Sequence, residues 1–124
     1  MKYVILIYSN PTSRKLWESF SDAERAEGFR AYAALDEDLA ASGELVVSEA
    51  LADPSTATRV AVREGRTITT DGPFAEAKEL LAGFYLVDCD SHERAVEIAA
   101  RVPGMAELGL VEVRPVLDLG GQGS

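Results

Sequence analysis

The sequence predicts an α+β domain in which two helices cover one face of a largely antiparallel β-sheet. Three observations support this fold class. A run of consecutive apolar residues opens the chain, which is the pattern of a strand buried on both faces. Two later segments repeat apolar residues at helical spacing, each behind a capping residue. Between them, β-rich runs separated by Glu64-Gly65 indicate a hairpin with glycine where φ is positive.

The first half of the chain predicts a strand followed by a long helix. Tyr3–Tyr8 is the apolar strand, and Asn10-Pro11-Thr12-Ser13 is expected to break it and open a loop. A helix is predicted over about Asp22–Ser42, because Ser21 and Glu24 match a capping box and Gly43 supplies a C-terminal stop.

One acid interrupts the apolar face of this helix. Asp36 falls within the arc formed by Phe29, Tyr32, Ala33, Leu35 and Leu39. An acid on a buried stripe needs a partner or a water-filled site. It can equally lie where the stripe meets solvent, and we favour that second interpretation.

The second half of the chain predicts three more strands of the sheet, together with a hairpin and a helix. The predicted segments are a strand Glu44–Leu51, a turn at Asp53-Pro54-Ser55, a hairpin of Thr58–Arg63 and Arg66–Thr70, a short helical turn at Lys78–Leu80, a strand Leu81–Val87, a helix Ser91–Val102 and a strand Leu110–Val116. The resulting order is β-α-β, a hairpin, then β-α-β, which fits a split βαβ sheet with an inserted hairpin.

The two-faced apolar strands also predict a homodimer. Two helices can cover only one face of the sheet, yet Tyr3–Tyr8 and Phe84–Val87 are apolar on both faces. In a chain of 124 residues, a second copy is the natural cover for the other face.

Composition excludes several classes of protein. A formal charge of -9 argues against nucleic acid as a partner, since its phosphates require clustered Lys and Arg. No apolar stretch is long enough to span a membrane, and the N-terminus does not resemble a signal peptide. The lone Cys89, expected as a packed small hydrophobe, permits no internal disulfide and fits the reducing cytoplasm. A cytoplasmic protein is therefore expected.

The stretch Asp71-Gly72-Pro73-Phe74-Ala75-Glu76-Ala77-Lys78-Glu79 combines a turn, three carboxylates and a lysine directly before an apolar strand. Gly72 permits positive φ and Pro73 fixes φ, so the turn can hold the Asp71 carboxylate in a defined direction. The simpler interpretation is that Asp71 only caps its own backbone.

This motif resembles the signature of the YCII-related bacterial proteins, in the subgroup named for DGPFAETKE, with Ala77 in place of the usual Thr. The resemblance extends to the opening strand, to Pro54-Ser55-Thr56-Ala57-Thr58, to Gly83-Phe84-Tyr85-Leu86 and to Val111-Glu112-Val113-Arg114-Pro115. It implies a ferredoxin-like fold and pairing into a dimeric α/β barrel. The chain length predicts one domain, over residues 1–118, and the glycine-rich end predicts a flexible tail at residues 119–124. It implies no known reaction.

The candidate catalytic residue is Asp71. The candidate ligand-binding residues are Tyr8, Asn10, Glu76, Lys78, Glu79, Tyr85 and Arg114. His92 is expected to be an exposed first-turn residue, so acid–base chemistry rests on carboxylates, Tyr or Lys. Shorter relatives are credited with a His–Asp pair, but this chain has no His on its first predicted helix, so the His half is not carried over. No metal and no cofactor is expected.

Two classes of function remain open. The first is a small-molecule enzyme or ligand binder with a polar cleft near the DGPF loop, between sheet and helices. The alternative is a non-catalytic accessory or regulatory protein linked to transcription initiation, because genes of the resembled family often neighbour those of sigma factors. We favour the first class, since a preorganised carboxylate beside a cleft is hard to explain as an interaction surface.

Overall fold

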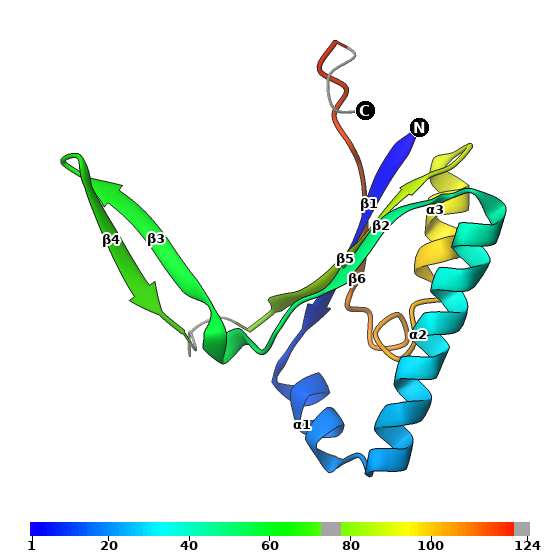
Figure 1. The fold of residues 1–124 in the computed structure, drawn as a ribbon, viewed down its shortest axis with the longest axis horizontal. Coiled ribbons are helices and arrows are strands. Elements are labelled where there is room, and N and C mark those ends of the chain that lie inside the picture. Colours follow the sequence, from blue (N-terminus) through cyan, green and yellow to red (C-terminus); the bar gives the residue numbers. More distant parts are fainter. Residues whose placement is uncertain (73–77, 121–124) are drawn as a thin grey trace.

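The computed structural model describes residues 1–72 and 78–120, and it has the predicted α+β architecture (Figure 1). Its elements are β1 (Lys2–Ser9), α1 (Pro11–Ser19), α2 (Asp22–Ser42), β2 (Leu45–Ala50), a 3-10 turn η1 (Pro54–Thr56), β3 (Thr58–Arg63), β4 (Arg66–Asp71), β5 (Leu80–Asp88), α3 (His92–Ala99) and β6 (Val111–Pro115).

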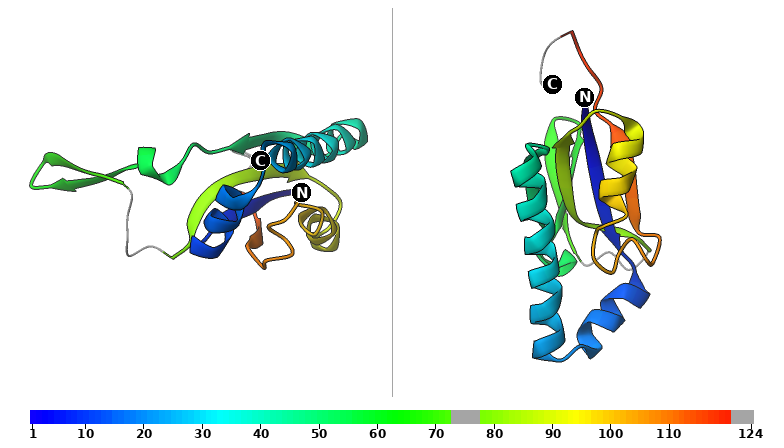
Figure 2. Two further views of the ribbon diagram at one scale, coloured as in Figure 1. Left: turned by 90° about the horizontal axis from the view of Figure 1, so that it is seen from below. Right: turned by 90° about the vertical axis from the view of Figure 1, so that its right-hand side faces the viewer.

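Four strands form the main sheet in the order β2-β5-β1-β6, and every neighbouring pair is antiparallel. Because β5 separates β1 from β2, the first β-α-β unit is split, as in a ferredoxin-like fold. Helices α2 and α3 lie side by side on one face of this sheet (Figure 2).

The core lies between this helical layer and the sheet. Alternation along β1 turns Tyr3, Ile5 and Ile7 toward the helices, where they are buried. They pack with a cluster from β5, α2 and α3 that includes Tyr85, Val87, Leu35, Leu39, Ala95 and Ile98. Cys89 is buried in the same cluster, which confirms its predicted role as a packed small residue.

The opposite face of the sheet has an apolar part and carries no helix among the described residues (Figure 2). The strand register places Val4 opposite Leu86 and Leu6 opposite Phe84 on this open face. These four side chains are half-buried by their neighbours within the sheet. The predicted two-faced apolar strands are therefore present, with only one face covered in the single chain.

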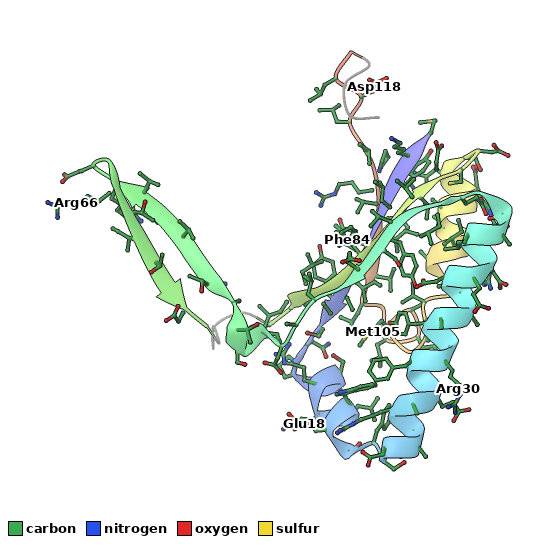
Figure 3. The ribbon with its side chains drawn as sticks, in the orientation of Figure 1. Glu18, Arg30, Arg66, Phe84, Met105 and Asp118 are labelled. Atoms are coloured by element: carbon green, nitrogen blue, oxygen red, sulfur yellow. The ribbon has the colours of Figure 1, made fainter. Side chains whose placement is uncertain are left out.

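The hairpin β3–β4 forms a separate two-stranded sheet that projects away from the body of the domain (Figure 1). Glu64 and Gly65 make its turn with positive φ at both positions, and the positive φ of Gly65 is the one that was predicted. Arg66 lies at the outer end (Figure 3). Val60 and Val62 are 65% and 68% exposed, so both valines lack a covering surface within the described chain.

Three expectations about secondary structure were wrong. The segment after β1 is a helix, α1, and not a loop. Asn10 caps it and Pro11 occupies its first position. The backbone N–H of Ser13 donates to the side-chain oxygen of Asn10, and the backbone N–H of Asn10 donates to the hydroxyl of Ser13, which completes a capping box. No helical turn forms at Lys78–Leu80, since β5 already begins at Leu80. Helix α3 ends at Ala99, three residues earlier than predicted, and is followed by a series of turns.

Candidate functional site

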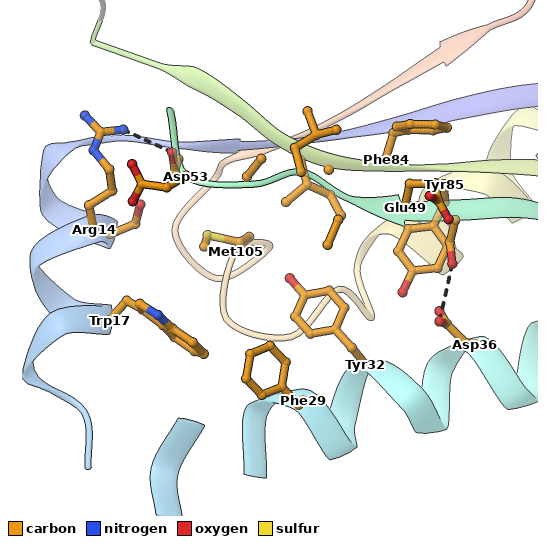
Figure 4. Close-up of a pocket in the computed structure, with 18 of the residues that line it drawn as sticks. Arg14, Trp17, Phe29, Tyr32, Asp36, Glu49, Asp53, Phe84, Tyr85 and Met105 are labelled. Carbon is orange, nitrogen blue, oxygen red and sulfur yellow. Dashed lines mark hydrogen bonds between the residues drawn. The ribbon is translucent and has the colours of Figure 1, made fainter. Parts of the chain in front are cut away.

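A cavity of about 630 Å³ lies between the sheet and helices α1 and α2 (Figure 4). Apolar and aromatic side chains form much of its wall: Ile7, Trp17, Phe29, Tyr32 and Met105. Met105 reaches this space from the segment after α3 and lies between the sheet and α2 (Figure 3). Polar and charged residues of the lining come from several elements: Ser9, Ser13, Arg14, Glu18, Asp36, Ser48, Glu49, Asp53 and Tyr85. Its size and lining are typical of a small-molecule site.

Asp36 and Tyr85 meet at the inner end of the cavity. The hydroxyl of Ser48 donates a hydrogen bond to Oδ2 of Asp36 at 3.3 Å (Figure 4). Oδ1 of Asp36 is buried and has no hydrogen-bond partner among the described residues. Burial raises the pKa of the Tyr85 hydroxyl far above its ordinary value, and the Asp36 carboxylate beside it raises that pKa further. Tyr85 is therefore held as a protonated donor next to a carboxylate.

Arg14 and Asp53 lie at the other end of the cavity, away from Asp36 (Figure 4). Arg14 donates from Nη1 to the hydroxyl of the buried Ser9 at 3.0 Å. The carboxylate of Asp53 accepts from the backbone N–H of Ser55 at 2.8 Å. That backbone bond chiefly lowers the pKa of Asp53, and the positive charge of Arg14 lowers it further. The two charges at this end therefore balance one another.

An aromatic cluster fixes the angle between α1 and α2 beside the cavity. Trp17 contacts Phe29 edge-on, with ring centroids 5.4 Å apart. The guanidinium of Arg25 lies 5.5 Å from the centre of the Trp17 ring and also donates to the backbone carbonyl of Trp17, at 3.1 Å from Nε. The end of α1 is thus tied to the start of α2, which positions both walls.

The structure separates the sequence-predicted site residues into several places. Tyr85 lines the cavity. Asn10 is the N-cap of α1, where its side chain accepts from the N–H of Ser13. Lys78 is exposed just before β5. Asp71, the predicted catalytic residue, is exposed at the end of β4, and Thr58 across the hairpin donates to its carboxylate at 3.3 Å. Glu76 lies outside the described residues.

Three other predicted residues gather on the open face of the sheet. The Tyr8 hydroxyl donates to Glu112 at 2.9 Å, and Arg114 donates to the other oxygen of Glu112 at 3.0 Å. The hydrogen bond to Glu112 is the main cause that raises the pKa of Tyr8, and the negative charge of Glu79 also contributes. The same two donors lower the pKa of Glu112. Tyr8, Glu79 and Arg114 are therefore neighbours, on the side opposite the cavity.

Asp71 does not line the 630 Å³ cavity. A second cavity, of about 400 Å³, lies at the base of the hairpin and is lined by residues that include Asp53, Thr56, Ala57, Arg59, Leu80 and Leu81. The N–H of Gly72, next to Asp71, donates to the carbonyl of Ala57 at 2.7 Å. The first residues of the motif thus adjoin this second space.

Sequence reasoning missed most of the cavity wall. Arg14 and Trp17 were missed because their helix was expected to be a loop. Asp36 was noticed as an acid on an apolar face, and two positions were considered for it. It is half-buried, as expected where the stripe meets solvent, and it is hydrogen-bonded to Ser48 with one oxygen shielded from water, as expected for a partnered acid. Its position therefore has features of both interpretations.

Three further observations concern the described residues. No three His, Cys, Asp or Glu side chains within residues 1–72 and 78–120 are grouped as a metal site would require. Among the helices that the structure describes, none is long and apolar enough to cross a membrane. His92 is exposed in the first turn of α3, as expected, and lies outside the cavity lining.

Comparison with known proteins identifies the family. An uncharacterised protein of Rhizobium meliloti (strain 1021) is 34% identical to this chain over 117 residues, which cover 94% of this chain and 92% of that protein. The model of the YCII-related domain matches residues 1–120. The chain therefore belongs to the YCII-related domain family.

Proposed function

We propose that this protein binds a small molecule in the cavity between the sheet and helices α1 and α2, and acts on it as an enzyme or as a dedicated binder. The observation that carries the proposal is the pairing of Asp36 and Tyr85 at the inner end of a space of about 630 Å³. A half-buried carboxylate with one unpaired oxygen is costly for a domain that only needs a packed core. A buried polar atom without a partner calls for an explanation, and contact with a ligand supplies one.

The geometry supports acid–base work or polar anchoring at this end. The Asp36 carboxylate accepts hydrogen bonds or a proton, while Tyr85, whose pKa is raised, donates one. Ser48 fixes the orientation of Asp36 from the neighbouring strand β2. A ligand held against the aromatic wall would thus meet an acceptor and a donor side by side.

A blocking substitution tests whether the cavity is the site. Ala50 lines the cavity from β2, so Ala50→Phe would fill part of it. We expect this variant to fold and to lose every ligand that a metabolite screen finds for the unmodified protein. Ala41→Phe, on an exposed position of α2, is the matched control and should keep binding. Ligands that bind Ala50→Phe with unchanged affinity would place the site elsewhere.

We also propose that the chain belongs to the DGPF subgroup and that this motif forms a second part of the site. Asp71 precedes Gly72, whose N–H donates to Ala57 in the wall of the smaller cavity, so the Asp71 carboxylate can contact a ligand that extends beyond the main cavity. Asp71→Asn should keep the Thr58 contact and the fold, yet weaken ligand binding. A lower melting temperature with unchanged affinity would instead identify Asp71 as a turn residue.

We also propose a homodimer in which the open sheet face pairs with its counterpart, as in a dimeric α/β barrel. Val4, Leu6, Phe84 and Leu86 form the apolar part of that face. The exposed valines of the hairpin, Val60 and Val62, are a second apolar surface that an associated copy could cover. Both surfaces support association, since an isolated two-stranded hairpin is only marginally stable in water.

A further inference from the structure

Asp36 lacks a positive partner in the cavity that it lines. Arg14 is the one basic side chain among the described lining residues. It lies at the opposite end, donates to Ser9, and faces the carboxylate of Asp53 (Figure 4). The lining also includes Glu18 and Glu49, so its charged residues are mainly acidic and Asp36 has no positive partner among them.

Neutral donors satisfy this carboxylate only in part. Ser48 supplies one hydrogen bond to Oδ2, and Oδ1 has no partner within the described residues. A carboxylate with two oxygens can accept about four hydrogen bonds. A cation brought to this point would replace a desolvated lone charge with a charge pair, which is strongest where water is excluded.

The cavity wall next to Asp36 is aromatic, and it suits the apolar part of a ligand that carries such a cation. Tyr32 precedes Asp36 by one helical turn on α2, so the two side chains share a face, and Phe29 and Trp17 continue the wall toward α1 (Figure 4). Aromatic faces attract cations as well as apolar groups. The same molecule already shows this preference outside the cavity, where Arg25 lies over the ring of Trp17.

We propose that the ligand is a cationic amine on an aromatic or apolar body, with its ammonium group on the Asp36 carboxylate and its body along Tyr32 and Phe29. The inference rests on the proposed function, because it names the ligand class of the same cavity. Asp36 lines the cavity, so its carboxylate can meet a ligand there. The Tyr85 hydroxyl lies beside the same carboxylate and is a second neutral donor at this end.

Three matched probes separate charge from shape. Phenethylamine, benzyl alcohol and phenylacetate share an aromatic ring but carry a positive, a neutral and a negative group. We expect nuclear magnetic resonance titration at up to about 10 mM to show phenethylamine binding at least about tenfold more tightly than the other two. Its largest shifts should fall on the amides of Ser48 and Tyr85, which flank the inner end.

Variants at two neighbouring positions of α2 test whether Asp36 binds the ammonium group. Asp36→Asn keeps the size of the side chain and an acceptor for Ser48, and should lower the affinity for phenethylamine at least about tenfold while leaving benzyl alcohol unchanged. Glu37→Gln removes a carboxylate one position along, on an exposed site, and should change neither. Circular dichroism establishes that both variants fold.

Two results would overturn the inference in different ways. Equal binding of all three probes, or tighter binding of phenylacetate, would show that the cavity takes small molecules but not cations, so the proposed function would stand without this ligand class. Failure of every probe to shift the Ser48 and Tyr85 amides of the unmodified protein would reject the amine assignment outright. The proposed function would then be judged separately by the metabolite screen and the Ala50→Phe variant. If Asp36→Asn does not fold, the probe series and its shift map on the unmodified protein decide the question.

Discussion

Arg94 of α3 donates two hydrogen bonds to the carboxylate of Glu44, fifty positions earlier in the chain, at 2.9 Å from Nε and 2.8 Å from Nη2. Glu44 lies between the end of α2 and the start of β2, so the pair ties both helices to the edge of the sheet. Its side chain is 15% exposed, which makes this the most enclosed of the ion pairs described. The Arg94 bond chiefly lowers the pKa of Glu44, from 4.5 to about 2, with help from the Ser42 hydroxyl.

The pair predicts a loss of stability in acid. Because the folded-state pKa of Glu44 lies below its unfolded value, its contribution is complete above pH 4.5 and disappears as the pH falls from 4.5 toward about 2. Glu44→Gln should lower the free energy of unfolding at neutral pH by about 1–2 kcal/mol. Urea denaturation of both proteins between pH 2 and pH 7 measures the difference, which should shrink at the acid end. A constant difference across this range would contradict the assignment.

Local signals in the sequence account for much of the fold. The capping box of Ser21 and Glu24, the helix stop at Gly43 and the apolar strand β1 rest on short-range features, and each appears as predicted. Helix α1 was missed because an Asn-Pro pair is compatible both with a loop after a strand and with the start of a helix. Only Ser13, three residues after Asn10, favoured the helix, and serine is an unusual residue at this position of a capping box.

The candidate site depended on long-range packing and was predicted less well. Asp36 and Tyr85 lie 49 positions apart in a chain whose strands pair out of sequence order, so no local pattern joins them. Sequence reasoning instead favoured Asp71, because its motif concentrates polar residues within nine positions. Burial and the presence of a cavity decide between such candidates, and neither is readable from residue types alone.

Gly83 is predicted to resist substitution, while Gly28 is not. A Cβ at Gly83 would lie 2.8 Å from the backbone carbonyl oxygen of Glu49 on the adjacent strand, so Gly83→Ala must push β2 and β5 apart. We expect a loss of about 1–3 kcal/mol in the free energy of unfolding. At Gly28, within α2, the nearest atom is Cζ3 of Trp17 at 3.8 Å, an ordinary contact. Gly28→Ala should therefore stabilise the protein by about 0.5–1 kcal/mol.

Thermal unfolding of the two glycine variants side by side provides the measurement. Opposite shifts in melting temperature are expected. A Gly83→Ala protein as stable as the unmodified one would show that β2 relaxes at little cost.

Asn10 is predicted to act as a helix cap. It should affect the cavity only indirectly, by stabilising α1, which forms part of the cavity wall. Asn10→Ala removes the acceptor for the N–H of Ser13 and should cost about 1 kcal/mol, with amide exchange in α1 becoming faster. Asn10→Asp keeps a side-chain oxygen for the cap and should behave like the unmodified protein in both stability and ligand affinity. Loss of ligand binding in Asn10→Asp, with normal exchange in α1, would instead restore the original expectation that Asn10 contacts the ligand.

The open sheet face yields the last prediction, for the oligomeric state. Ile5 and Ile7 point toward the helices, at 0% and 5% exposure, so a lysine at either would disrupt the core and not report on association. Leu6 lies between them on the other face, opposite Phe84. Each square ångström of apolar surface buried there by a second copy would contribute about 25 cal/mol.

We expect light scattering to show a dimer for the unmodified protein at micromolar concentration and a folded monomer for Leu6→Lys. Ala41→Lys, on the exposed side of α2, should remain a dimer. A monomer in all three samples would leave the apolar face without a second copy to cover it and would contradict the proposed barrel.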